Sequence, residues 1–441
     1  MNASRLVLKI FIIIFIAGFT KAEADERAIC TNSAKQINPA ISGSKIVWLD
    51  DRKYEYNWEI YLYDLDTRVE TMLITPYMSI SGYPLNISGN KIVWENHRDD
   101  KAGIVNPDIY LYNLDTGVET PLCTGSWYQR YPAISGNKIV WQDDRNGGRD
   151  MNYDIYLYDL DREVEIPICT ELRHQYYPAI DGNKIVWADK RNELNGRYYD
   201  IYLYDLDTGI ETPICTSPGN QSFPAISGNK IVWVDTGYDD DRNSIYLYDL
   251  ETKEEIAIRQ TSSGAKGLIS KPAISENKIV WDDYRNGQEN ADIYLYNIDT
   301  GVETPICNSQ GNQIHPKISG NKIVWQDYRN GYYESDIYLY ELEDSPVTTT
   351  INGDTSTTTI CEENDLCCTE RIYGEHTTQT ELLRYFRDNV LSKTQEGRAL
   401  IRLYYQGSPT IVRAMKEDDK FKEWVKTIID SVLPMIGGEM E

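Results

Sequence analysis

The segment Pro132-Ala-Ile-Ser-Gly-Asn-Lys-Ile-Val-Trp141, with Asp154-Ile-Tyr-Leu-Tyr-Asp159 after it, decides the fold because the chain carries seven versions of this pair of motifs. A tryptophan marks each repeat, and successive tryptophans lie 44 to 48 residues apart: Trp48, Trp94, Trp141, Trp187, Trp233, Trp281 and Trp325. A fixed period of this length, with several strands in each unit, is typical of a β-propeller, in which each unit forms one blade of a ring. The sequence therefore predicts an all-β, seven-bladed propeller.

Each unit is predicted to contain four strands. In the third unit they are expected at 131–135, 138–143, 155–159 and 164–170. Ile139 and Trp141 face one side of their strand and Val140 faces the other, so both faces are apolar, as expected when neighbouring blades cover both faces of a sheet. We expect the tyrosine rings of the third strand to lie toward the blade edges, because their hydroxyls need partners or water.

The two ends of the repeat region complement each other. The seventh repeat ends with its third strand near Tyr340, and no fourth-strand sequence follows it. Residues 27–31, Arg-Ala-Ile-Cys-Thr, match the fourth-strand sequence Thr-Pro-Ile-Cys-Thr at 212–216. We therefore predict that the N-terminal strand completes the last blade and closes the ring, which removes an exposed sheet edge.

Residues 1–24 have the layout of a secretory signal peptide. Arg5 and Lys9 precede an apolar run, and Ala22-Glu-Ala24 supplies a small-residue cleavage pattern. An uncleaved membrane anchor is the alternative, but the apolar run is shorter than the ~20 residues of a spanning helix. We therefore expect an extracellular protein, secreted or held at the cell surface, with no membrane-spanning segment after signal cleavage.

The propeller is predicted to occupy residues 25–345, and two further segments follow it. Residues 346–360 are rich in threonine and indicate a solvated linker. Residues 361–441 are predicted to form a small α-helical C-terminal domain, because Thr378 and Glu381 form a capping box ahead of apolar residues spaced for one helix face. A docking or anchoring role without chemistry is the favoured interpretation of this domain.

The formal net charge of −25 limits the partners of the chain. A strongly acidic surface repels nucleic acid phosphates and anionic lipid headgroups, and it favours solubility. We therefore expect no nucleic acid partner.

Five of the eight cysteines occupy one slot of the fourth strand: Cys30, Cys123, Cys169, Cys215 and Cys307. Equivalent slots in different blades should lie beyond the ~7 Å limit for a disulfide, so we expect these cysteines to pack as small apolar side chains. Cys361, Cys367 and Cys368 cluster beyond the ring, where a disulfide from Cys361 to Cys367 or Cys368 is expected in an exported protein. A metal site is the weaker alternative there, since the only histidine nearby is His376.

Carboxylates and arginines recur with the blades. Five units carry a Trp-x-Asp-x-Arg pattern, as at Asp143 and Arg145, and most units place another acidic residue before the third strand, as at Asp154. Clustered carboxylates suit calcium. We favour the alternative that each arginine ties the loop to carboxylates of its own blade by charge-assisted hydrogen bonds, because a feature of nearly every blade serves the shared fold. The sequence therefore predicts no cofactor and no metal site, with calcium as the alternative.

Catalysis has little support in the sequence. The four histidines are His97, His174, His315 and His376. None accompanies a recognisable nucleophile element, a zinc-ligand pair or a phosphate-binding glycine loop. We therefore predict that the protein is not an enzyme.

Ligand binding is predicted on one face of the ring. The turns between strands one and two and between strands three and four are short and uniform, whereas the loops on the other face vary in length and carry unshared aromatic residues. Such rings among Asn, Asp and Arg suit a protein or sugar ligand. The candidate binding residues are Tyr54, Tyr56, Trp58, Trp127, Tyr128, Tyr176, Tyr177, Tyr198, Tyr199, Tyr332 and Tyr333.

The repeat motifs resemble a known family. The sequences Pro-Ala-Ile-Ser-Gly-Asn-Lys-Ile-Val-Trp, Asp-x-Arg-Asn-Gly and Asp-Ile-Tyr-Leu-Tyr-Asp-Leu-Asp-Thr-Gly look like TolB-like propeller repeats of archaeal cell-surface proteins, including surface-layer-associated ones. The resemblance covers about residues 27–345 and implies a seven-bladed ring outside the cell, with a binding or structural role. The segment 367–374 and the helical sequences after it are similar to a C-terminal domain headed by a Cys-Phe-Ile box.

These observations together predict an exported, noncatalytic propeller that binds a cell-envelope protein or polysaccharide through its variable-loop face. The main alternative is an extracellular polysaccharide lyase or hydrolase, since a shared fold does not fix function. A cluster of carboxylates with raised pKa in a central pocket would favour the enzyme, and an aromatic rim would favour binding. A self-associating structural component of a surface coat is the third hypothesis.

Overall fold

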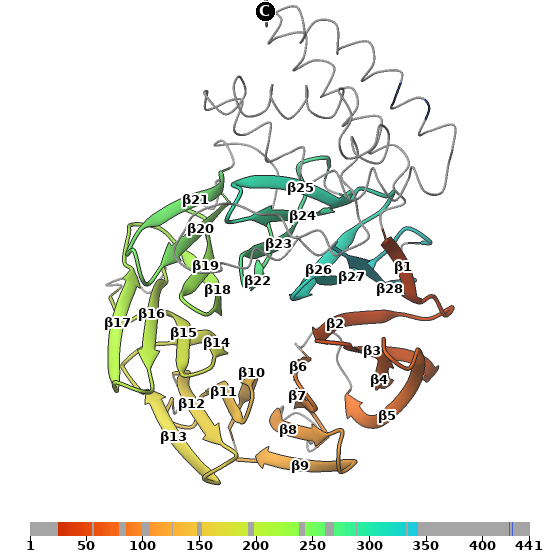
Figure 1. Ribbon diagram of the computed structural model, residues 1–441. Helices are drawn as coiled ribbons and strands as arrows, with labels where there is room; N and C mark the ends of the chain where they lie inside the picture. The colour runs from red at the N-terminus through yellow and green to blue at the C-terminus, as the bar shows by residue number, and fades with distance from the viewer. Residues whose placement is uncertain are drawn as a thin grey trace, which may run out of the picture. The chain divides into compact units, whose positions relative to one another are not determined.

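The computed structural model shows seven four-stranded sheets placed around an axis (Figure 1). It describes residues 25–342, except for 55–56, 79–84, 99–105, 126, 148–151, 193–197, 238–242, 261–268, 288 and 332–333, and it also describes Glu423 and Lys426. The predicted signal peptide, linker, C-terminal helices and terminal cysteines lie outside these residues, apart from Glu423 and Lys426. Among the residues with a described structure, no helix is both long enough and apolar enough to cross a membrane.

Each blade is an antiparallel meander whose strands follow one another from the axis to the rim (Figure 1). The first three blades are β2 (Gln36–Ser42), β3 (Lys45–Tyr54), β4 (Asn57–Asp64) and β5 (Val69–Met78); β6 (Asn86–Ser88), β7 (Lys91–Asn96), β8 (Asp108–Asn113) and β9 (Val118–Cys123); and β10 (Gln129–Ser135), β11 (Lys138–Asp143), β12 (Asp154–Asp159) and β13 (Val164–Cys169). The next two are β14 (Gln175–Asp181), β15 (Lys184–Asp189), β16 (Asp200–Asp205) and β17 (Ile210–Cys215); and β18 (Gln221–Ser227), β19 (Lys230–Asp235), β20 (Ser244–Asp249) and β21 (Glu255–Gln260). The last two are β22 (Ala273–Ser275), β23 (Lys278–Asp283), β24 (Asp292–Asn297) and β25 (Val302–Cys307); and β26 (Gln313–Ser319), β27 (Lys322–Asp327) and β28 (Asp336–Glu341), with β1 (Asp25–Cys30) as the fourth strand.

The seventh blade is completed by the N-terminal strand, as predicted. β1 pairs antiparallel with β28, and Arg27 lies opposite Leu339 in the register. The Arg329 guanidinium of the same blade donates to the Glu26 carboxylate on β1. The first and last parts of the ring are therefore joined by both backbone pairing and an ion pair.

A circle of hydrogen bonds joins the blades on the face that carries the short turns. In each blade, a backbone N–H of the turn between the first two strands donates to a side chain at the end of the first strand of the preceding blade, over 2.6 to 3.0 Å. The donor and acceptor pairs are Gly43 and Ser319, Gly89 and Ser42, Gly136 and Ser88, Gly182 and Ser135, Gly228 and Asp181, Glu276 and Ser227, and Gly320 and Ser275. The serine of the Ile-Ser-Gly-Asn motif is thus an inter-blade acceptor, and the circle closes where the seventh blade meets the first.

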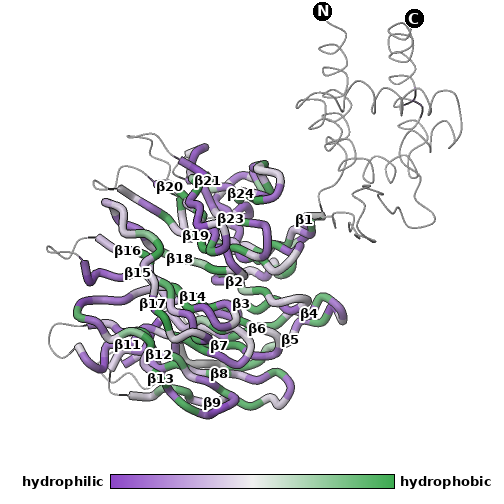
Figure 2. The backbone as a smooth tube through the Cα atoms, turned by 60° about the vertical axis from the view of Figure 1, so that its left-hand side comes forward, coloured by the Kyte–Doolittle hydropathy of each residue, from purple (hydrophilic) through white to green (hydrophobic). Residues whose placement is uncertain are grey.

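The hydrophobic core is divided among the blade interfaces. Val140, Ile155 and Leu157 of the third blade pack in one buried cluster with Ile185 and Trp187 of the fourth. Hydrophobic segments accordingly recur around the ring in Figure 2. Because each sheet is covered on both faces, its inner strands are apolar at successive positions, which explains the continuous Ile-Val-Trp run.

The prediction for the tyrosine rings was wrong at the first tyrosine of the Ile-Tyr-Leu-Tyr motif. Tyr156 is buried and stacks on Trp141 with ring centroids 6.2 Å apart, and the other six blades have an equivalent stacked pair. Its hydroxyl is satisfied inside the blade, because the Asn146 side-chain amide donates to it over 2.9 Å. A local polar partner therefore allows this ring to lie away from the edge.

The arginines bind the carboxylates of their own blades, which confirms the favoured hypothesis. Asp143 is buried and accepts from the Trp141 indole at 3.0 Å and from the Arg145 guanidinium at 2.6 Å. Arg145 also pairs with Glu165 of strand four and lies 4.1 Å above the Tyr156 ring. The first, fourth and seventh blades repeat this arrangement at Asp50 and Arg52, Asp189 and Arg191, and Asp327 and Arg329.

The five cysteines of the fourth-strand slot are buried and free, as the spacing argument predicted. They also have polar contacts that the sequence did not indicate. Cys123 Sγ lies 3.2 Å from the Arg145 guanidinium of the next blade. Burial raises the pKa of the Cys123 thiol to about 12, so it stays a neutral acceptor for that arginine.

We expect removal of β1 to destabilise the ring. A chain beginning at residue 31 should melt roughly 5–10 °C below one beginning at residue 25, because β28 then loses its partner strand and Arg329 loses Glu26. Thermal unfolding followed by circular dichroism measures this difference. A synthetic peptide of residues 25–32 should restore part of the loss, and equal melting temperatures of the two chains would contradict the closure.

Arg145→Met should lower the free energy of unfolding by about 2–4 kcal/mol, because it leaves the buried Asp143 carboxylate without its main cation. The loss stays in this range because the Arg145 side chain is 28% exposed, so water screens part of its attraction to Asp143. Urea denaturation measures it, with Arg162→Met as the control, since Arg162 lies 4.0 Å from Asp159 and is 73% exposed. A chelator should leave the midpoint unchanged; a drop in the midpoint on chelation would revive the calcium alternative.

Candidate functional site

The loops divide into two faces, as the sequence predicted. On the variable face, the segment entering each blade contacts the loop after its second strand; for example, the Tyr128 backbone N–H donates to the Asp144 carboxylate at 2.6 Å. On the other face, the two short turns of each blade are joined, as where the Leu160 N–H donates to the Asn137 carbonyl at 2.9 Å. Candidate residues such as Tyr128 and Tyr176 therefore lie on the variable face.

One position at or just before the first strand of a blade lies next to the axis and varies in residue type. It is the residue before the proline of this segment, and its members in the described part of the chain, called axial residues here, are Asn38, Tyr131, Tyr177, Phe223, Lys271 and His315. All except Lys271 have φ between 53° and 56°, where the register with the second strand shifts. A bulge of this kind redirects a side chain out of the regular strand pattern.

Side chains of neighbouring blades hold several axial residues in place. Gln142 Oε1 accepts from the Tyr177 backbone N–H at 3.1 Å, and Gln326 Oε1 accepts from that of Asn38 at 3.3 Å. Asp282 does the same for His315 at 3.1 Å and also accepts from the Ser270 hydroxyl. The axial backbone is therefore fixed by contacts between successive blades.

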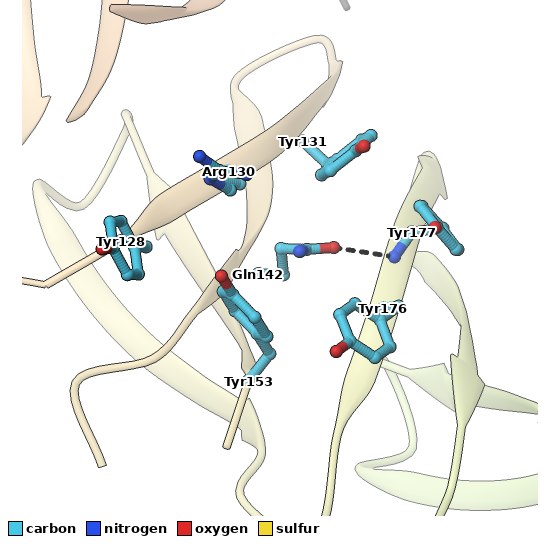
Figure 3. A pocket seen from close by; sticks show the side chains of 7 residues that line it. All are labelled: Tyr128, Arg130, Tyr131, Gln142, Tyr153, Tyr176 and Tyr177. Carbon is cyan, nitrogen blue, oxygen red and sulfur yellow. Dashed lines mark hydrogen bonds between the residues drawn. The ribbon is translucent and has the colours of Figure 1, made fainter. Parts of the chain in front are cut away.

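A pocket of about 430 Å³ opens between the third and fourth blades. Its lining residues, drawn in Figure 3, are Tyr128, Arg130, Tyr131, Gln142, Tyr153, Tyr176 and Tyr177. Tyr128 comes just before β10, Arg130 and Tyr131 lie at its start, and Tyr176 and Tyr177 lie on β14. Gln142 on β11 lies between these two groups, with its bond to Tyr177 shown as a dashed line. Two inner strands thus present one aromatic side chain after another to the same space.

The aromatic rings of the pocket continue beyond its lining. Tyr176 lies 5.0 Å from the His174 ring and 5.6 Å from Tyr199, and Tyr177 lies 4.3 Å from Phe223. The Lys190 ammonium lies 4.5 Å from the Tyr199 ring centroid, within range of a cation–π interaction. The cluster therefore extends across the third, fourth and fifth blades.

Buried charges lie behind the pocket. Glu95 is fully buried, with the His97 Nε2 atom 3.0 Å and the Arg130 Nε atom 3.5 Å from its Oε1. Burial raises the pKa of Glu95 and also that of Asp144, although Arg130 opposes both shifts. Neither carboxylate lines the pocket. Arg130, which interacts with both, does line it and is the charged group that a ligand would meet.

Three tyrosine hydroxyls of the pocket, those of Tyr153, Tyr176 and Tyr177, remain protonated well above neutral pH. Burial raises the pKa of Tyr153 to about 12 and raises the pKa of Tyr176 and Tyr177 as well. Burial also lowers the pKa of His174, so the imidazole beside Tyr176 is neutral at pH 7. The pocket therefore offers hydroxyl groups, ring faces and one guanidinium.

The structure brings together only some of the predicted binding residues. Tyr128, Tyr176 and Tyr177 line the pocket, and Tyr199 packs against it. Trp127 is 43% exposed next to Tyr128, and Tyr198 is half-buried. Trp58 is only 3% exposed and packs in the core between the first two blades, while Tyr54 has a described backbone in β3 and Tyr56, Tyr332 and Tyr333 lie outside the described residues.

Sequence reasoning missed Arg130, Tyr131, Gln142 and Tyr153 as pocket residues. Tyr131 had a usable signal, because the residue before Pro-Ala-Ile-Ser differs from blade to blade within an otherwise uniform motif. Gln142 had the same signal in the residue after each Ile-Val-Trp motif, which is Leu49, Glu95, Gln142, Ala188, Val234, Asp282 or Gln326. Variation inside the repeated strands thus marked the site as much as variation in the loops.

Comparisons with known proteins support the fold. No protein-family model matches the sequence, and no curated protein is a significant relative. Among solved structures, the chain is similar to the β-propeller domain of the Trilobed protease from Pyrococcus furiosus, with 15% identity, 76% of this chain and 99% of that chain covered, and a TM-score of 0.54. It is also similar to oligogalacturonate lyase from Vibrio parahaemolyticus, with 12% identity, 74% of this chain and 95% of that chain covered, and a TM-score of 0.54. For TolB from Acinetobacter baumannii the identity is 15%, 62% of this chain and 66% of that chain are covered, and the TM-score is 0.45.

The fold and these similarities define the chain as a seven-bladed β-propeller. The Pyrococcus domain is described as having an open velcro topology, whereas β1 pairs with β28 in this chain. At identities of 12 to 15% the similarity concerns the fold alone, so ligand and activity are argued from the pocket.

Asp282→Asn should change how the free energy of unfolding depends on pH, because it removes a buried carboxylate. Burial raises the pKa of Asp282 to about 6, above the ~3.9 of an unfolded chain, so its contribution to stability is present at pH 4 and lost as the pH rises through 6. Wild type should therefore lose roughly 2–3 kcal/mol relative to Asp282→Asn between pH 4 and pH 7. Urea denaturation across this range tests the prediction, with the exposed Asp66→Asn as control; parallel curves for both variants would refute it.

Proposed function

We propose that this propeller binds a polysaccharide of the cell envelope, without catalysis, through the aromatic pocket between its third and fourth blades. The observation that carries the proposal is the lining itself, in which five tyrosines surround Arg130 and Gln142. A flat tyrosine ring packs against the apolar face of a sugar ring, while its hydroxyl and the nearby amide and guanidinium reach the sugar hydroxyls. Concave aromatic sites with a few placed polar groups are typical of small-molecule and sugar binding.

The rigidity of the pocket supports binding. Tyr176 and Tyr177 lie on β14 between ordered neighbours, and Gln142 fixes the Tyr177 backbone. Aromatic side chains lose few rotatable bonds on binding, and those on strands lose fewer still. The site therefore needs little ordering when a saccharide enters.

The protonation states favour binding over turnover. The carboxylates with raised pKa, Glu95 and Asp144, are both buried behind Arg130 and do not line the pocket. A general acid or base must come within hydrogen-bond reach of the substrate. Tyr153, Tyr176 and Tyr177, which do line it, have a raised pKa and hold their protons too strongly to serve as bases at neutral pH.

The location outside the cell belongs to the same proposal. It is supported by the signal-peptide pattern of residues 1–24 and by the resemblance of the repeats to archaeal cell-surface propellers. A cell-envelope polysaccharide is the ligand that such a location makes available.

A polysaccharide lyase or hydrolase is the second candidate. Arg130 beside Tyr128 and Tyr153 favours it, because a guanidinium can neutralise the carboxylate of an acidic sugar while a neighbouring hydroxyl transfers a proton to or from the substrate. This activity would require a conformation in which a tyrosine or a buried carboxylate reaches the substrate.

Tyr176→Ala should weaken saccharide binding about tenfold or more, since it removes the ring at the centre of the cluster. Affinity is measured by calorimetry on the full chain against polygalacturonate, galactan and dextran, without assuming which one binds. Leu172→Ala is the matched control, because Leu172 is 83% exposed in the loop that carries His174 and does not line the pocket.

Three outcomes separate the candidates. Binding that is lost in Tyr176→Ala and kept in Leu172→Ala, with no chain cleavage, supports the proposal. New reducing ends or shortened chains would favour the enzyme, and self-association without any saccharide binding would favour a structural surface component.

A further inference from the structure

We propose that the bound saccharide carries a carboxylate, which is recognised by a basic site at the ring axis formed by Lys271, His315 and Lys317. This inference rests on the proposed function and names the class of sugar as acidic. The three residues belong to the sixth and seventh blades, whereas the pocket belongs to the third and fourth.

Lys271 reaches across the axis toward the pocket. It is the axial residue of the sixth blade, and its Nζ atom lies 4.6 Å from the Phe223 ring centroid, 5.4 Å from that of Tyr131 and 5.5 Å from that of Tyr177. Tyr131 and Tyr177 are two of the pocket-lining residues. One ligand can therefore place a sugar ring on the tyrosines and an acidic group against the Lys271 ammonium.

Two further basic groups come from β26 of the seventh blade. His315 is the axial residue there, and Lys317 follows two positions later, where most other blades have alanine, as at Ala133 and Ala179. His315 and Lys271 are exposed at the axis, and Lys317 is half-buried. Because alanine fills this position in most other blades, the fold does not require a lysine there.

The basic groups repel one another. Burial lowers the pKa of His315 to about 4, with smaller contributions from the positive charges of Lys271 and Lys317. Burial, together with the charge of Lys317, lowers the pKa of Lys271 to about 8. Burial also lowers the pKa of Lys317. His315 is therefore a neutral imidazole at pH 7, and a bound anion would relieve the repulsion between Lys271 and Lys317.

No carboxylate neutralises this cluster within the described part of the chain. Among the residues that the structure describes, no acidic side chain forms an ion pair with Lys271 or Lys317 within 4.0 Å, although the protein as a whole has a formal net charge of −25. The buried Asp282 carboxylate, which binds the backbone of His315, accepts from the His315 N–H and from the Ser270 hydroxyl. In a protein with this net charge, the composition alone would predict acidic groups around most lysines, so this basic site is unusual.

Arg130 is a further cation at the pocket, with its guanidinium 5.4 Å from the Tyr128 ring centroid. It lines the pocket, and its nearest carboxylate, Glu95, is fully buried. Arg130 and Lys271 thus lie beside different pocket tyrosines, Tyr128 for Arg130 and Tyr131 and Tyr177 for Lys271, which suits a saccharide chain with acidic groups at intervals. Charge-assisted hydrogen bonds to carboxylates are stronger than those to neutral hydroxyls, so they distinguish an acidic sugar from a neutral one.

The test compares an acidic and a neutral trisaccharide on the full chain by calorimetry, with trigalacturonate and galactotriose as the probes. Lys271→Met and Lys317→Met should each weaken trigalacturonate binding roughly tenfold and leave galactotriose binding unchanged. Lys184→Met, at the start of β15, is the control and should change neither. Melting curves of all variants establish that they fold.

A pH series gives a readout that a packing role would not produce. Affinity for trigalacturonate should fall between pH 7 and pH 9, as Lys271 loses its proton, while affinity for galactotriose stays constant. The groups that face Lys271 are Lys317, His315 and the rings of Tyr131, Tyr177 and Phe223, with Asp282 bound to the His315 backbone. Because Lys271→Met removes the titrating amine, this variant should show a weaker pH dependence.

Failure of this inference differs from failure of the proposed function. Equal affinity for the two trisaccharides, or a loss of both in Lys271→Met, would overturn the acidic site and leave saccharide binding intact. Absence of binding to either trisaccharide and to the larger polysaccharides would overturn both.

Discussion

Circular closure is the constraint on which the rest of this structure depends. Each blade has two apolar faces and can bury them only against two neighbours, so the first and last blades must meet. The Ser319 hydroxyl accepts from the Gly43 amide at the same place in the motif as every other inter-blade pair, and β1 supplies the edge that β28 lacks. A mismatch in any blade would be carried around the ring and would appear at this junction.

The repeated residues and the exceptional ones have different tasks. Trp141, Asp143 and Arg145 form a network that recurs in other blades and ties loop, strand and neighbouring cysteine together. Positions that vary within the same framework, such as Tyr131 and Lys271, lie at the axis and around the pocket. Because the framework is rigid and the same in every blade, a single substitution at a variable position changes the binding surface without changing the fold.

The site also shows how local charge can differ from overall charge. The chain is strongly acidic, yet many of its carboxylates are bound to arginines, asparagines and backbone N–H groups within the blades, as Asp143 and Asp154 are. Lys271 and Lys317 have no such partners at ion-pair distance in the described structure. At an ionic strength of 0.15 M the field of distant charges is screened beyond about 8 Å, so a ligand at the axis responds mainly to the groups beside it.

The sequence by itself determined the blade number, the four strands of each unit and the closure by the N-terminal strand, since all three follow from a period and a strand pattern that recur along the chain. It also identified Tyr128, Tyr176 and Tyr177 as aromatic residues on one face. Only the tertiary structure decided that Trp58 is a core residue, that Tyr131 and Tyr153 share a pocket with Tyr176, and that Lys271 lies against rings from three other blades. The physical reason is that repeats fix which strands pair nearby, whereas contacts across the axis join residues dozens to more than a hundred positions apart, and their distances depend on how seven sheets close around one centre.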